Sequence, residues 1–178
     1  MLSLTKIGFL LVAYQLAFIQ CSCPNVKPVD NVDLDQWANG VWYDVAVTRN
    51  NHPNREIFSS LAYNHYGDNN IISFNSVNLP LTDDDYVRGT GQVVSNGKMV
   101  FSFGIGDSRQ DAEITVVALS DEILGLFGCI NGDESSEITW VSARQENPDE
   151  KVKAEIQKFL DSYVDPHTNQ KASWKTRI

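Results

Sequence analysis

Side chains that commonly perform catalysis are sparse and scattered in this sequence. The three histidines are His52, His65 and His167, and no two of them have the spacing of a metal-binding pair. The sequence contains neither a Gly-x-Ser-x-Gly nucleophile motif nor a glycine-rich phosphate loop that leads into a helix. We therefore expect a binding protein rather than an enzyme, with no obligatory cofactor.

Two groups of acidic residues are interpreted as solvated surface turns. Asp30, Asp33 and Asp35 lack the glycine at the sharp turn and the closing glutamate of a calcium-binding loop. The three consecutive aspartates at 83–85 lie in an expected turn between strands. We expect no metal site in either group.

Aromatic residues offer a different chemistry, the binding of an apolar molecule. A tyrosine such as Tyr63 combines an apolar ring with a hydroxyl group that orients a ligand. Any single aromatic residue is more often ordinary core than a ligand contact, but four or five together suit a flat conjugated molecule. The candidates are Tyr63, Phe74, Tyr86, Phe101, Phe103, Phe127 and Trp140.

Eight short strands are expected to position these residues. They recur every ten to fourteen residues or so and are joined mostly by hairpins, of which Asn96-Gly97 is the strongest turn signal. Such a series is typical of a mainly β fold, a closed antiparallel up-and-down barrel. The expected strands span residues 41–49, 57–66, 71–77, 86–95, 98–104, 113–119, 123–130 and 137–144.

One amphipathic helix is expected after the strands, packed on the outside of the sheet. Asn147 is the predicted cap, Pro148 the first helical residue and Pro166 the stop, so the helix spans about 148–164. The tail at 166–178 is polar and is expected to be loose unless Trp174 anchors it. The apolar face consists of Val152, Ile156, Phe159, Leu160, Tyr163 and Val164.

Length and charge restrict the class of partner. The chain has 178 residues and a net charge of −9, which suits one domain with a hydrophobic core and gives no basic surface for nucleic acid. The same charge disfavours binding to an anionic membrane surface. Oligomerisation is left open.

The N-terminus has the pattern of a secretory signal peptide. Residues 7–19 form an apolar run after a single lysine, and the run is too short to span a bilayer comfortably. We expect residues 1–21 to be removed, to within two residues, and a retained membrane anchor is the alternative. The product would be one secreted domain at 22–178, with its barrel at about 39–145.

Three cysteines, Cys21, Cys23 and Cys129, are present. If cleavage removes Cys21, then Cys23–Cys129 is the only disulfide possible in an oxidising compartment. It would close a loop of roughly a hundred residues and contribute about 4–5 kcal/mol in chain-entropy models. If cleavage lies before Cys21, one thiol is left over.

Three short motifs follow one another along the chain. Residues 23–33 run into Gly40-x-Trp42, Ser120-Asp121 leads to Cys129, and Arg144 stands at the end of the last expected strand. In these three motifs the chain resembles the lipocalins. It is most similar to the insect bilin-binding proteins of the insecticyanin type and is more distantly similar to apolipoprotein D.

The resemblance implies a barrel floor formed by Gly40, Trp42 and Arg144, with the guanidinium across the indole. A partly desolvated contact of this kind contributes about 1–2 kcal/mol. With Trp42 inward, strand alternation gives Asp44 and Ala46 the same direction. A buried acid is costly unless it is paired or hydrated, so Asp44 is either a polar ligand contact or part of a wetter region.

On the second strand, Leu61, Tyr63 and His65 share one face, and Leu61 and Tyr63 are candidate lining residues. The resemblance implies a small hydrophobic ligand, for which a bilin such as biliverdin is the first candidate. The alternative ligands are another lipid, a retinoid or haem. A further alternative is a role through protein contacts in defence or regulation.

The chain also departs from the bilin-binding pattern. A second family disulfide is missing, because Phe58 stands at its first position and the tail has no cysteine. The turn at 120–123 is about two residues shorter than in the family, and the usual tyrosine is missing there. These differences leave open a divergent member with a different ligand.

Overall fold

The computed structural model describes residues 23–47, 58–66, 71–79, 86–103, 109–133, 137–164, 169 and 173–174. The expected signal peptide, Cys21, Pro166, the aspartates at 83–85 and the end of the first expected strand at Arg49 lie outside these residues. The described strands are β1 (Asn39–Val47), β2 (Phe58–Tyr66), β3 (Ile71–Leu79), β4 (Tyr86–Ser95), β5 (Lys98–Phe103), β6 (Gln110–Leu119), β7 (Ile123–Ile130), β8 (Ile138–Ala143) and β9 (Ser173–Trp174). The described helices are α1 (Leu34–Trp37) and α2 (Glu150–Ser162).

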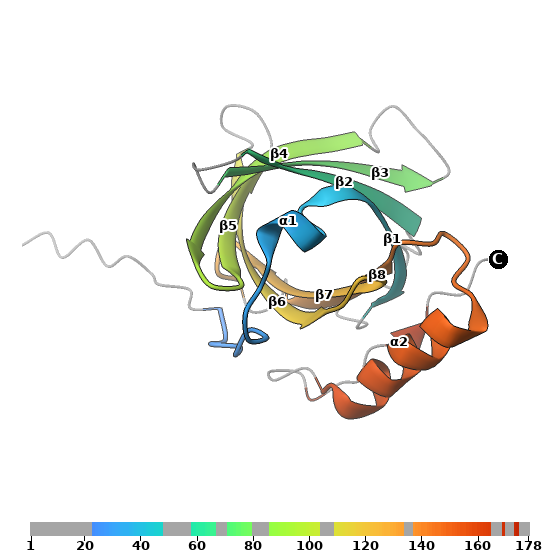
Figure 1. Cartoon of the computed structure of the whole chain (residues 1–178). Coiled ribbons are helices and arrows are strands. Elements are labelled where there is room, and N and C mark those ends of the chain that lie inside the picture. Colours follow the sequence, from blue (N-terminus) through green and yellow to red (C-terminus); the bar gives the residue numbers. More distant parts are fainter. Residues whose placement is uncertain are drawn as a thin grey trace, which may run out of the picture.

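Eight antiparallel strands form a closed barrel (Figure 1). Consecutive strands from β2 to β8 pair with one another, and β1 pairs with both β8 and β2, which closes the sheet. The short β9 pairs with β1 at Ala46 and Val47, so the backbone around Trp174 is held against the barrel. The expected fold, a mainly β up-and-down barrel with a C-terminal helix outside it, is confirmed.

Strand lengths differ from the expected ones where the sequence lacks alternation. The expected strand at 113–119 begins earlier, at Gln110, because its backbone continues to pair with β5 as far as Phe103. The exposed polar residues at its start hide this extension in the sequence. The last barrel strand is shorter than expected and leaves Arg144 just beyond its end.

The helix starts later than expected. Asp149, and not Asn147, caps α2: its carboxylate oxygen Oδ1 accepts from the Val152 N–H at 2.9 Å. Gln145 Oε1 accepts from the Asp149 N–H at 3.0 Å and fixes the cap in place. The predicted first helical residue, Pro148, therefore precedes the cap.

Helix α2 packs on the outside of the barrel (Figure 1). Its buried residues are Val152, Ile156 and Leu160, and each contributes about 1.5–3 kcal/mol by burial. The barrel residues beneath them are Val45, Ala46, Ala118, Ile123, Val141 and Ala143. Both faces of this part of the sheet are consequently covered.

The side of the sheet that Ala46 faces differs from the one expected from alternation along β1. The pairing of β1 with β8 shifts between Asp44 and Ala46, and such a bulge sets two residues against one on the partner strand. Ala46 consequently belongs to the cluster beneath α2, together with Val45. The prediction that Ala46 shares the direction of Trp42 is wrong.

The N-terminal arm is fastened to the outside of the barrel. Cys23 and Cys129 form a disulfide with a Cα–Cα distance of 5.8 Å, within the usual range for such a bond. Further along the arm, the Val32 N–H donates to Asn96 Oδ1 at 3.0 Å. A Cβ added at Gly97 would lie 2.7 Å from Pro28 Cβ, so the β4–β5 turn and the arm fit closely together.

The arm leads into α1, which lies across one end of the barrel (Figure 1). Asp33 caps this single turn as expected: its Oδ1 accepts from the N–H groups of Asp35 at 2.9 Å and Gln36 at 3.3 Å. The last residue of α1, Trp37, is fully buried in the interior cluster. In the part of the chain that the structure describes, neither helix is long and apolar enough to cross a membrane.

Candidate functional site

The closed end of the barrel is built around Trp42 and Arg144. Trp42 is fully buried, and Arg144 Cζ lies 3.7 Å from the centroid of its ring. Arg144 also donates to the carbonyl oxygens of Asn39 at 2.7 Å and Gln36 at 2.6 Å. Partial burial lowers the pKa of the Arg144 guanidinium, and the nearby Glu122 opposes this shift. The guanidinium thus joins α1, the start of β1 and the end of β8.

Gly40 allows this arrangement. Its φ of +86° lies in the region that glycine adopts readily. A Cβ at this position would lie 3.2 Å from Arg144 Nη1. Glycine is therefore favoured here by the backbone conformation, and the guanidinium leaves little room for a Cβ.

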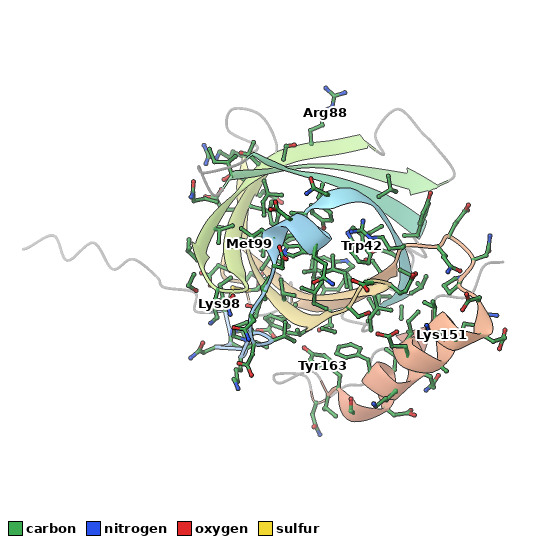
Figure 2. The ribbon with its side chains drawn as sticks, viewed as in Figure 1. Trp42, Arg88, Lys98, Met99, Lys151 and Tyr163 are labelled. Carbon is green, nitrogen blue, oxygen red and sulfur yellow. A yellow bond between two sulfur atoms is a disulfide. The ribbon has the colours of Figure 1, made fainter. Side chains whose placement is uncertain are left out.

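The interior beyond this floor is lined mainly by apolar and aromatic side chains. Tyr63 is buried and lies with its ring centroid 5.1 Å from that of Trp37 and 6.3 Å from that of Phe101. Figure 2 shows Trp42 and Met99 inside the barrel and Arg88 pointing away from it. The buried members of the cluster are Trp37, Ala38, Trp42, Tyr63, Ile72, Met99, Phe101, Ala112, Ile114, Val116, Leu124 and Leu126, with Trp140 packed against them.

Two glycines make room for the aromatic lining. A Cβ at Gly91 would collide with the ring of Phe101. A Cβ at Gly128 would lie 2.5 Å from the ring of Trp140. These glycines let the two rings lie directly against the barrel wall.

An acid is buried within this lining. Asp44 is 5% exposed, and its Oδ1 accepts from Ser142 Oγ at 2.6 Å. Burial, and secondarily the charge of Asp44, raise the pKa of the Tyr63 hydroxyl above its ordinary value of 10.0. The interior therefore offers a hydrogen-bond acceptor of negative charge among apolar walls.

The structure brings together four of the nine predicted lining residues. Asp44, Tyr63, Phe101 and Trp140 all belong to the interior. For four others the described structure covers only the backbone, and their role as lining stays a prediction. Their strand partners are Trp42 for Leu61, Tyr63 for Phe74, Val77 for Tyr86 and Gly89 for Phe103.

Phe127 is not a lining residue. It is 1% exposed, but it packs in a separate cluster with Val26 and Cys129, with Cys23 against them. This cluster lies between β7 and the N-terminal arm. The interpretation of Phe127 as a ligand contact is therefore corrected to a role in holding the arm.

Sequence reasoning missed Trp37 and Ser142. Trp37 ends a turn capped by Asp33 and stands three residues before Gly40, and its size and position were the available signal. Ser142 stands two residues after Trp140, so strand alternation places the two on one face.

Among the described residues, no group of three or more His, Cys, Asp or Glu side chains could hold a metal ion.

Comparison with known proteins identifies the architecture. Neither a protein-family model nor a curated protein sequence matches this chain. Among solved structures, insecticyanin from the tobacco hornworm Manduca sexta matches with a TM-score of 0.67 and 19% identity, over 88% of this chain and 87% of that one. This chain has the lipocalin fold.

Two more solved structures share this lipocalin fold. The tryptamine complex of the amine-binding protein of Rhodnius prolixus matches with a TM-score of 0.64 and 14% identity, over 78% of this chain and 79% of that one. The major allergen Per a 4 from cockroaches matches with a TM-score of 0.59 and 19% identity, over 85% and 94%. The TM-scores establish the fold, but the sequence identities are too low to transfer a ligand from these proteins. The ligand therefore has to be inferred from the interior of the barrel.

Proposed function

We propose that this protein binds a small hydrophobic molecule inside its barrel and carries it outside the cell, without a catalytic step. The observation that carries the proposal is the interior cluster of aromatic side chains around Tyr63, with the carboxylate of Asp44 among them. Apolar walls with a few polar groups are the usual composition of a small-molecule site. The apolar run at residues 7–19 and the Cys23–Cys129 disulfide support export.

A bilin is the first candidate ligand. The similarity of residues 23–33 and of Gly40-x-Trp42 to the insect bilin-binding proteins supports it, as does the shared fold with insecticyanin. The rings of Tyr63, Phe101 and Trp140 offer flat apolar surface to a conjugated molecule.

An absorption spectrum and a titration test the bilin. Protein purified from its natural source is expected to absorb red light, and biliverdin is expected to quench the fluorescence of the interior tryptophans in a saturable way. A colourless protein whose tryptophan fluorescence is unchanged by biliverdin would rule out this ligand.

A protonated aromatic amine is the second candidate, and Asp44 is the observation that favours it. A carboxylate has about four acceptor sites, so Asp44 can accept from an ammonium group and keep its hydrogen bond from Ser142. Aromatic faces nearby attract a cation as well. The similarity to the amine-binding protein of Rhodnius prolixus, solved with tryptamine, supports this candidate.

The variant Asp44→Asn separates the two ligands. Asparagine still accepts from Ser142 but carries no charge, so the affinity for tryptamine is expected to fall about tenfold or more while that for biliverdin changes little. The control is Asp161→Asn on the exposed face of α2, which should bind both ligands as the wild type does. Equal losses for tryptamine in the two variants would remove Asp44 from amine recognition.

A further inference from the structure

Trp37 and Trp42 are both fully buried at the closed end of the barrel, but only one has its N–H group satisfied. Trp42 Nε1 donates to the carbonyl oxygen of Trp37 at 2.8 Å. Trp37 Nε1 has no hydrogen-bond partner among the residues that the structure describes. Two buried tryptophans, five positions apart, therefore differ in whether their N–H group has a partner.

A buried N–H group without a partner is costly and uncommon. Nearly all buried polar atoms in folded proteins bind another protein group or an ordered water molecule. Leaving a donor unsatisfied costs the full desolvation of that group. We therefore expect the N–H group of Trp37 to have a function that offsets this cost.

The surroundings of Trp37 indicate where the partner comes from. Its ring lies edge-on to Tyr63, at 71° between the two planes, and belongs to the interior cluster with Phe101 and Met99. Most of the neighbouring side chains in this cluster are apolar. A molecule held in the barrel is therefore well placed to supply an acceptor.

We propose that the Trp37 indole N–H is a donor to the bound small molecule, whose acceptor group lies at the α1 end of the barrel. This inference rests on the proposed function and adds a chemical requirement, which the oxygens of a bilin meet and a protonated amine such as tryptamine does not. The ligand carries a carbonyl, carboxylate or similar oxygen at one end, and its apolar body extends along the barrel. Trp37 is thereby a specificity-determining residue, whereas Trp42 is part of the floor.

A pair of probes that match in shape tests this requirement. 2-Acetylnaphthalene carries a carbonyl group, and 2-ethylnaphthalene has nearly the same shape without an acceptor. The dissociation constants of both are measured by calorimetry for the full chain and for Trp37→Phe. The ratio of the two constants cancels the general hydrophobicity of each probe.

In Trp37→Phe, the ratio of the affinity for the acetyl probe to that for the ethyl probe is expected to fall by about three- to tenfold. A fall of this size corresponds to the free energy of one neutral hydrogen bond. The melting temperature of ligand-free Trp37→Phe is expected to fall only by the cost of the lost ring volume, because no satisfied hydrogen bond is removed. Trp42→Phe, which loses a satisfied N–H group, should melt at a lower temperature. Preservation of the preference in Trp37→Phe would overturn the inference.

A second measurement needs only the wild-type protein. The sequence has four tryptophans, and the indole N–H resonance of Trp37 can be assigned by nuclear magnetic resonance. The acetyl probe should move this proton resonance downfield, and the ethyl probe should not. If both probes bind and the resonance responds to neither, the inference fails and the proposed function stands; if no tested ligand binds, both fail.

Discussion

The guanidinium of Arg144 lies flat over the indole of Trp42, with 3.7 Å between Cζ and the ring centroid. The two residues are far apart in the sequence, but both lie at the closed end of the barrel. Because Arg144 also binds the carbonyl oxygens of Asn39 and Gln36, it holds α1 in place over the floor. We expect this contact to stabilise the barrel rather than to bind the ligand.

Arg144→Ala is therefore expected to lower the free energy of unfolding by about 3 kcal/mol, since it removes a cation–π contact and charged hydrogen bonds. Arg144→Lys should lose about half of that, because lysine lacks the planar fork. Urea denaturation measures both. Arg109→Ala, which removes an exposed ion pair with Asp111, should cost under about 1 kcal/mol. Equal stabilities of Arg144→Ala and Arg109→Ala would contradict this role.

The Cys23–Cys129 disulfide joins residues 106 positions apart. Replacement of both cysteines by serine is expected to lower the free energy of unfolding by about 2–5 kcal/mol. Reduction of the wild-type protein should produce a similar loss in the same urea titration. The barrel strands do not depend on the bond for their pairing, so the circular dichroism of the folded variant should remain that of a β protein. A reduced wild type that is as stable as the oxidised form would refute the prediction.

Gly91→Ala is expected to displace the ring of Phe101, because a Cβ at this position would overlap the ring. Overpacking of this kind costs about 1–3 kcal/mol. Thermal denaturation should show the loss, and near-ultraviolet circular dichroism should show the altered aromatic packing. Gly128→Ala should act in the same way through Trp140. If Gly91→Ala melted at the wild-type temperature with an unchanged spectrum, the close contact with Phe101 would not exist.

Tyr63 should make the protein sensitive to alkali. Burial and the charge of Asp44 raise its pKa above 10.0 in the folded state, while the unfolded chain has a pKa of about 10. Its contribution to stability is thus fully present below pH 10, and it is lost as the pH rises from there towards the folded-state pKa.

The free energy of unfolding should therefore fall above pH 10 by about 1.4 kcal/mol per pH unit from this residue alone. Urea denaturation between pH 9 and pH 11.5 measures the slope. Tyr63→Phe should flatten the slope by that amount. An identical pH dependence in wild type and Tyr63→Phe would show that the hydroxyl group ionises normally in the folded protein.

The floor of the barrel was predictable through the resemblance to the lipocalins, because Gly40-x-Trp42 and Arg144 match two motifs of that family. Gly40 has a positive φ, Trp42 stands two residues after it, and Arg144 directly follows the last barrel strand. The apolar face of α2 was predictable from its three- and four-residue spacing. Its exact cap was not, because Asn147 and Asp149 are both good capping residues and the bond from the Asp149 N–H to Gln145 selects between them.

The faces of two strands could not be read from the sequence. Nearly all of β7 is buried, because the interior cluster covers one face and the N-terminal arm and α2 cover the other. Without alternation between apolar and polar residues, nothing indicated that Phe127 faces the arm. In β1 the bulge after Asp44 changes the direction of Ala46, and no residue in that stretch marks a bulge.

The surroundings of Asp44 also could be predicted only in part. Alternation from Trp42 was sufficient to place Asp44 inside the barrel. Its partner Ser142 is distant in the sequence and became visible only when β1 was paired with β8. The unsatisfied N–H group of Trp37 likewise depends on tertiary packing, and no sequence pattern indicates it.

The central claim, that the barrel interior holds a small hydrophobic molecule, is tested most directly by titration of the purified protein with biliverdin and with tryptamine. Tryptophan fluorescence is recorded for the wild type and for Ala112→Phe, which adds a ring to the interior cluster. The account predicts saturable one-to-one quenching of the wild type by at least one ligand, and an affinity at least tenfold lower in a folded Ala112→Phe. Binding that is unaffected by Ala112→Phe, or no quenching by either ligand, would contradict it.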